Sequence, residues 1–135
     1  MKRPLTIVLL ALLSIGLFTA AAPTPVTTFT LVQGLPSVMN VGDVQTVIVH
    51  VDSDQEFISV AARPSFQYPG KGIVAVQAGE RTGRETSATL EVTFKAKSPT
   101  ERMENGVAPV HVFVGVRYGG GYVAVEDYVF YVQVP

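Results

Sequence analysis

The sequence predicts an all-β domain, in which about seven strands form a sandwich of two antiparallel sheets. Three observations support this fold class. Runs rich in valine and aromatic residues recur at the roughly 8–12-residue spacing that is typical of sandwiches. Several runs alternate apolar and polar side chains, as a strand with one buried face does. Glycine, proline, asparagine and aspartate separate the runs, and no segment shows a helical period.

The first residues have the layout of an export signal. Lys2 and Arg3 are followed by the apolar run Leu5–Phe18 and then by small residues. This order predicts a signal peptide over residues 1–21, removed after Ala21. The alternative is an uncleaved membrane anchor, but the run is short for the roughly 20 residues of a spanning helix. We therefore expect a secreted, periplasmic or cell-surface protein that contacts the membrane only if this segment stays attached.

Composition narrows the possible functions. The chain has 135 residues, enough for one domain and not comfortably for two. Removal of residues 1–21 lowers Lys+Arg from 10 to 8 against 11 acidic residues, which leaves a net charge of about −3. So mild a charge argues against a nucleic-acid binder. Cysteine is absent from the sequence, which excludes disulfides, thiol catalysis and cysteine metal sites.

The first half of the mature chain is predicted to contain short strands. A proline-containing extended tether covers residues 22–26, and the sandwich domain covers residues 27–135. Its first strand begins with Thr27–Leu31. A brief extended piece over Ser37–Val41 leads to a Gly-Asp turn, and Val44–Val51 follows as a strand with alternating valines.

The middle of the chain continues the pattern. Strands are predicted over Phe57–Ala62, Ile73–Ala78 and Ala88–Ala96, and the last of these has the cleanest alternation. Residues 65–71 form an aromatic bend that could cap the core. Gly79–Thr86 is polar and contains glycine, so we expect a mobile loop there. In the connection before the last strands, residues 99–104 could form one helical turn.

The chain closes with a predicted β-hairpin. Its arms are Ala108–Tyr118 and Tyr122–Val134, and Gly119–Gly121 provides the positive φ angles of a tight connection. A bulge is expected at Glu126–Asp127, because these acids interrupt the apolar residues of the second arm. On the first arm, one face should present His111, Phe113, Gly115 and Arg117; on the second arm, one face should present Val129, Tyr131 and Gln133.

Two short motifs resemble a known family. Asn40-Val41-Gly42-Asp43-Val44-Gln45-Thr46-Val47, followed by alternating valines, resembles the opening of bacterial immunoglobulin-like domains of the CARDB and related cell-surface kinds. In those domains a Val-Gly-Asp/Glu turn leads into strand B. Asn105-Gly106 before the next valines is similar to their approach to strand F. The resemblance covers roughly residues 27–134. It implies an immunoglobulin-like sandwich with the hairpin arms as strands F and G, an adhesion, spacer or accessory role, and no catalytic residues.

Catalytic and metal sites are not predicted. His50 and His111 should lie on opposite outer faces of the sandwich, which separates them as metal ligands. The acidic spacing Asp52-x-Asp54-x-Glu56 lacks the glycine and terminal glutamate of a calcium loop. No serine has the surroundings of a nucleophile elbow. We therefore expect no cofactor, no metal and no enzymatic activity.

The aromatic residues of the hairpin are the candidate functional surface. Both faces of the second arm are largely apolar, so one face is either covered by other segments or exposed to a partner. The sequence favours an exported protein-binding or structural accessory module at the cell envelope, with a surface protein or a second copy as partner. The alternatives are a self-assembling subunit that exchanges Thr27–Leu31 and a carbohydrate-binding sandwich. The candidate partner-binding residues are Phe113, Arg117, Tyr118, Tyr122 and Tyr131.

Overall fold

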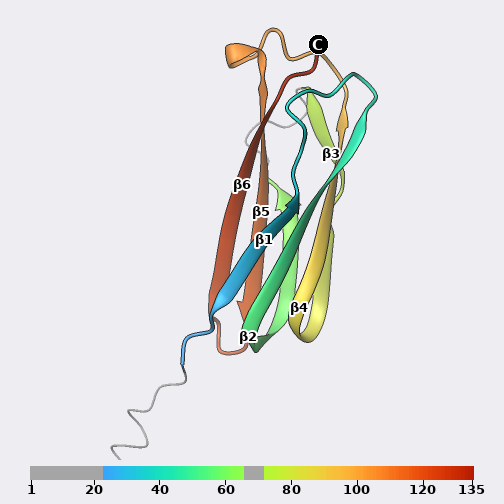
Figure 1. Cartoon of the computed structure of the whole chain (residues 1–135). Helices are drawn as coiled ribbons and strands as arrows, with labels where there is room; N and C mark the ends of the chain where they lie inside the picture. The colour runs from blue at the N-terminus through green and yellow to red at the C-terminus, as the bar shows by residue number, and fades with distance from the viewer. Residues whose placement is uncertain (1–22, 66–71) are drawn as a thin grey trace, which may run out of the picture.

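The computed structural model describes residues 23–65 and 72–135 (Figure 1). The expected signal peptide at residues 1–21 lies outside them, as does the aromatic bend except for Ser65. The described part is all-β and contains no helix long and apolar enough to cross a membrane. Its elements are β1 (Thr27–Gln33), β2 (Val44–Pro64), β3 (Ile73–Gln77), β4 (Gly79–Ala96), the short 3₁₀ helix η1 (Glu104–Gly106), β5 (Ala108–Tyr118) and β6 (Val123–Val132).

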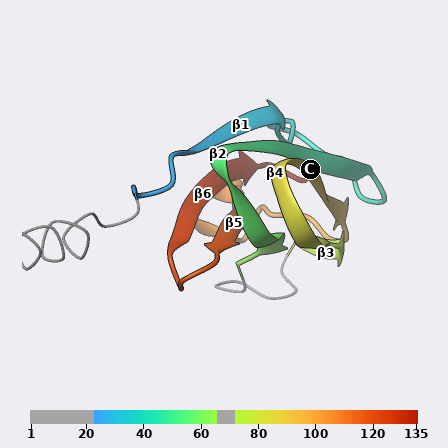
Figure 2. The same ribbon diagram turned by 90° about the horizontal axis from the view of Figure 1, so that it is seen from below.

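Two long strands, β2 and β4, build the sandwich. Hydrogen bonds connect the strands in the order β3-β4-β2-β5-β6, and β1 also pairs with β2. Every pairing between these strands is antiparallel. The register between β2 and β4 shifts between Asp52 and Phe57. Both strands turn back near this shift, and the two arms of β2 diverge from a corner (Figures 1 and 2). Each long strand therefore contributes one segment to each of two layers.

The layers follow from the partners of each segment. Residues 44–52 of β2 pair with β1 and with residues 87–95 of β4, and the end of β4 also pairs with β3. Residues 57–64 of β2 pair with β5, and β5 pairs with β6. The result is an immunoglobulin-like sandwich in which β5 and β6 lie in one layer and β1 in the other. The predicted fold class is confirmed.

The N-terminal half of β4 corrects one expectation, because Gly79–Thr86 is a strand and not a loop. Gly79 pairs with Ala62, and Arg81 pairs with Val60 on β2. The polar composition misled the prediction, since backbone hydrogen bonds do not require apolar side chains. This segment borders its layer and its side chains are mostly exposed, and charged residues are common on such edges.

The core fills the space between the two layers. The alternating valines of β2 and β5 point inward, and each fully buried valine contributes roughly 1.5 kcal/mol or more of burial energy. Met39 joins them from the segment before β2, where Met39 N–H donates to the Gln133 carbonyl at 3.0 Å. The largest fully buried side chains are Phe57, Met39, Val47, Val49, Val51, Val60, Val92, Val112, Val114, Val116, Val132 and Val134.

The closing hairpin forms as predicted, without the expected bulge. Its register runs unshifted from Arg117 opposite Val123 to Ala108 opposite Val132. The expected bulge at Glu126–Asp127 is wrong because the alternation is never broken. Glu126 points to the same inward side as Ala124 and Tyr128. It remains exposed because β6 is the border strand, so its carboxylate can stay hydrated.

The hairpin connection uses its glycines as expected. Tyr118 N–H donates to the Tyr122 carbonyl at 2.9 Å, and Gly121 N–H donates to the Tyr118 carbonyl at 3.3 Å. Gly120 and Gly121 have φ angles of 87° and 91°, a region that favours glycine. Gly120 and Gly121 therefore provide the expected turn conformation, while Gly119 has no positive φ angle.

Hydrogen bonds of Thr100 hold the connection between β4 and β5 in place. Its side chain is fully buried, its hydroxyl donates to the Gly106 carbonyl at 2.7 Å, and the same oxygen accepts from Val134 N–H at 2.9 Å. The helical turn expected at residues 99–104 is displaced, because the 3₁₀ helix η1 begins only at Glu104. Thr100 thereby ties this connection to the C-terminal end of the chain.

Candidate functional site

The outward side of β5, β6 and residues 57–64 of β2 is here called the hairpin face. Large apolar side chains remain exposed along it, led by Tyr131 at 65% and including Phe113 at 43%. Val123, Val125 and Val129 occupy alternate positions on the same side of β6. Five large apolar residues thus share one surface. Exposed apolar patches are typical of interaction sites when they exceed a few hundred Å², which makes the hairpin face the candidate site.

A hollow of about 340 Å³ lies in the hairpin face. Ala61, Gly115 and Val125 form one row across the strands at this point. Gly115 has no side chain and Ala61 only a methyl group, so the surface is indented there. A methyl group added at Gly115 would lie 3.6 Å from the Phe113 ring. The lining consists of Ser59, Ala61, Arg63, Glu80, Phe113, Gly115, Val116, Arg117 and Val123.

Charged groups lie within and beside the apolar strip, since Asp127 stands between Val125 and Val129 on β6. Arg63 lies 3.4 Å from Glu80, and both side chains are more than half exposed. His111 Nδ1 lies 3.4 Å from Asp127 Oδ2. Arg117 is exposed and has no carboxylate within 4.0 Å among the described residues. Exposed pairs of this kind contribute little to stability.

Three of the five predicted partner-binding residues lie on the same face, with Arg117 near the turn and Tyr131 towards the opposite end of the hairpin. Phe113, Arg117 and Tyr131 all lie on the hairpin face, as their alternation indicated. Tyr122 is exposed at the turn, where its ring centroid lies 5.8 Å from that of Tyr118. It therefore stands at the end of the face.

Tyr118 is a correction, because it is 2% exposed and offers no surface to a partner. Its ring meets Phe57 edge-to-face at 6.4 Å, and its hydroxyl donates to Ser53 Oγ at 2.7 Å and hydrogen-bonds Thr27 Oγ1. The alternation of β5 predicts this burial. Tyr118 follows the buried Val116 by two positions, so the two side chains point to the same inward side. An aromatic side chain at a strand end was mistaken for surface.

Sequence reasoning placed Val129 beside Tyr131 but missed Val123 and Val125 of β6, and it missed the hollow. Val123 and Val125 lie on the same side of β6 as Tyr131, and counting by twos from Tyr131 would have found them. The hollow depends on Ala61 and Gly115 being neighbours on different strands. That register could not be deduced from the sequence, because the β2 bulge determines it.

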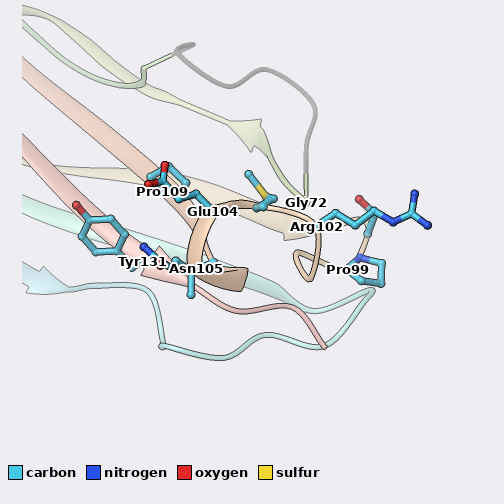
Figure 3. A pocket seen from close by; sticks show the side chains of 10 residues that line it. Gly72, Pro99, Arg102, Glu104, Asn105, Pro109 and Tyr131 are labelled. Carbon is cyan, nitrogen blue, oxygen red and sulfur yellow. The ribbon is translucent and has the colours of Figure 1, made fainter.

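A second cavity, of about 570 Å³, adjoins the upper end of the hairpin face. Pro109 on β5 is paired with Tyr131 on β6, and these two residues belong both to the hairpin face and to the lining of this cavity. Figure 3 shows Tyr131 at one end of the lining and Pro99 and Arg102 at the other. The remaining lining residues are Gly72, Ser98, Met103, Glu104, Asn105 and Val107. The exposed Tyr131 ring therefore borders both the strip and this cavity.

His50 forms a polar cluster on the outer side of the other layer. Its Nδ1 lies 2.8 Å from Thr89 Oγ1, while its Nε2 lies 3.1 Å from Ser87 Oγ and 3.2 Å from Asp52. In a catalytic triad, serine and aspartate contact different ring nitrogens, so that one nitrogen is free to accept the serine proton. Here both contact Nε2, and the cluster does not have that arrangement.

The two histidines lie in different layers, as expected, since His50 is on the β1-paired part of β2 and His111 is on β5. Among residues 23–65 and 72–135, no three His, Cys, Asp or Glu side chains are grouped to hold a metal ion.

Comparisons with known proteins leave the family open. No family model matches the chain, and no curated protein matches it. One similar solved structure is E. coli alpha-2-macroglobulin in its native conformation, studied by cryo-EM, with 18% identity over 85% of this chain and a TM-score of 0.45. This chain spans 7% of that protein. A likeness at this level carries no argument, so the fold rests on the strand pairing and the CARDB resemblance stays a prediction.

Proposed function

We propose that this protein is a non-catalytic protein-binding module of the cell envelope that contacts its partner through the hairpin face. The observation that carries the proposal is the strip of exposed valine, phenylalanine and tyrosine on β5 and β6. Burying such a strip against a partner releases roughly 25 cal/mol for each Å² removed from water. Aromatic and arginine side chains are also the residues that most often dominate binding energy at interfaces.

The hollow and its surroundings support the same proposal. A partner side chain of apolar character would fit at Gly115, with Phe113 on one side and Arg117 on the other. Arg63 and Asp127, which lie next to these apolar residues, would give polar contacts to the same partner. An apolar centre with a polar rim is the usual anatomy of a protein interface.

Export and the absence of catalysis belong to the same proposal. The predicted signal peptide at residues 1–21 supports an extracytoplasmic location. The nitrogen geometry of the His50 cluster supports a non-catalytic role, because Ser87 and Asp52 share one ring nitrogen. The exchange of Thr27–Leu31 and carbohydrate binding stay predictions; in this structure β1 pairs with β2 of its own chain.

Site-specific photo-crosslinking in the native host tests the proposal. A photoreactive residue at Val125 should form protein adducts, because Val125 is an exposed residue of the hairpin face and pairs with Gly115 beside the hollow. The matched control is the same residue at Glu91, which is exposed on β4 in the other layer. Adding Phe113→Ser and Tyr131→Ser should reduce the Val125 adducts. Equal adducts from Val125 and Glu91, or adducts unaffected by the two serines, would refute the assignment.

A further inference from the structure

The hairpin face has the charge pattern of a self-complementary surface. We propose that it binds the hairpin face of a second copy of this chain, around a two-fold axis that crosses the strands at the Gly115–Val125 row. This inference rests on the proposed function and names the partner. Contacts around a two-fold axis require that the surface carry both members of each interacting pair.

Both members of such a pair flank the Gly115–Val125 row. On one side of the row, Phe113 and Asp127 are directly opposite each other on β5 and β6. On the other side, Arg117 lies at the same distance along β5, two residues from Gly115. Arg117 is exposed and lacks an acidic partner among the described residues, and the Asp127 side chain is 50% exposed. An aromatic ring beside a carboxylate can bind a guanidinium group, which stacks on the ring and pairs with the carboxylate.

A two-fold axis in the plane of contact brings these groups together. Rotation about an axis that crosses the strands reverses the direction along each strand and leaves the lateral position unchanged. Arg117 of one copy is then placed over Phe113 of the other and next to its Asp127. The symmetry creates this contact twice. Each contact combines cation–π stacking with a charge-assisted hydrogen bond, and both strengthen when water is excluded.

Few side-chain atoms lie at the centre of the contact, where the axis crosses β5 and β2. Gly115 and Ala61 leave the hollow there, so that the two faces can approach without a clash of large side chains. Val125 supplies apolar surface from each copy. Glu80, in the same row as Ala61, would approach its symmetry mate, but Arg63 lies 3.4 Å from it and offsets the negative charge.

The position of the axis determines how much of the face is covered. β5 ends at Tyr118, three residues beyond Gly115, so the two copies overlap over residues 112–118 of β5 and over the residues paired with them. Strands lie about 4.8 Å apart and rise about 3.4 Å per residue, so this overlap covers on the order of 400 Å² in projection. A standard interface buries about 800 Å² of accessible surface on each partner, and smaller contacts are typical of weak, reversible association. We therefore expect a reversible dimer.

Charge exchange between Arg117 and Asp127 tests this pairing. The full chain should dimerise in sedimentation equilibrium, and Arg117→Asp or Asp127→Arg should each weaken dimerisation about 10- to 100-fold, because like charges then meet twice. A mixture of the two variants should form a heterodimer of near wild-type affinity, because each contact again joins opposite charges. Glu91→Arg, an exposed charge change on the other layer, should leave dimerisation unaffected.

Three results would overturn the inference. A wild-type chain that stays monomeric at high concentration has no self-partner at this face; adducts from Val125 to a different protein would then still support the proposed function. A wild-type dimer that survives both single substitutions uses another surface. Variants that are monomeric alone and do not associate when mixed refute the Arg117–Asp127 contact, provided that circular dichroism shows both variants folded.

Discussion

At the scale of single residues, buried polar side chains hold the ends of the sandwich together. Tyr118 is the clearest case, because its hydroxyl reaches Ser53 on β2 and Thr27 on β1 from β5. Tyr118→Phe keeps the edge-to-face contact with Phe57 and removes both hydrogen bonds. The free energy of unfolding should fall by about 1 kcal/mol, or more if the serine and threonine hydroxyls find no water. Urea denaturation measures this change, and an unchanged midpoint would mean that neither bond contributes.

Gly34 is a second residue whose identity is determined by a neighbour. A methyl group at this position would lie 2.7 Å from Phe130 Cε1, closer than real side chains approach. Gly34→Ala should therefore lower the free energy of unfolding by about 1–3 kcal/mol, the usual cost of overpacking. The matched control is Gly119→Ala, which meets nothing within 4 Å. Equal effects of the two substitutions in thermal unfolding would show that the Phe130 contact does not matter.

At the scale of elements, β6 combines a core-facing side with an exposed border. Tyr128 packs inward on this strand, and burial is the main cause that raises the pKa of its phenol, followed by the negative charge of Glu126. Because the folded pKa lies above the unfolded value of about 10, the associated stability is fully present below that value. It is lost as the pH rises through the folded pKa.

Glu126→Gln tests this account of β6. The substitution should lower the pKa of Tyr128 only in part, because burial remains as the larger cause. An NMR titration of the Tyr128 ring measures the change. Glu56→Gln, which removes an exposed carboxylate from β2, should leave that pKa unchanged. A Tyr128 pKa equally affected by both variants would show that the effect is not local to β6.

Most elements were predictable because their side chains alternate. The clean alternation of Ala88–Ala96 and the valines of β5 gave the correct strands and the correct inward faces. Gly79–Thr86 was mistaken for a loop because its pairing with β2 is a backbone property that polar side chains conceal.

The candidate site was predictable in part, for a related physical reason. Phe113, Arg117 and Tyr131 follow from alternation within one strand. The hollow depends on Ala61 lying beside Gly115, a contact between distant segments that the bulge in β2 determines. Tyr118 was expected on the surface because it is aromatic and lies near the turn. Its position two residues after Val116 instead places its side chain in the core.

At the scale of the whole molecule, the two layers differ in what they expose. The layer of β5 and β6 presents the apolar hairpin face. The other layer also exposes valines, among them Val44 and Val76, but its outer side carries the polar cluster of His50 and Thr89. The buried valines of both layers support this surface from beneath, in a chain that has no cysteine to form a disulfide. Binding through the hairpin face is the central claim of this account.

The native size of the protein in envelope extract tests that claim most directly. The comparison is between Val125→Lys, on the hairpin face, and Val76→Lys, at an exposed valine of β3. The wild type and Val76→Lys should elute in size-exclusion chromatography as a complex larger than the chain alone. Val125→Lys should elute as the free chain, because a lysine charge would be buried without a partner. A complex that survives Val125→Lys, or that is lost equally with Val76→Lys, would contradict the account.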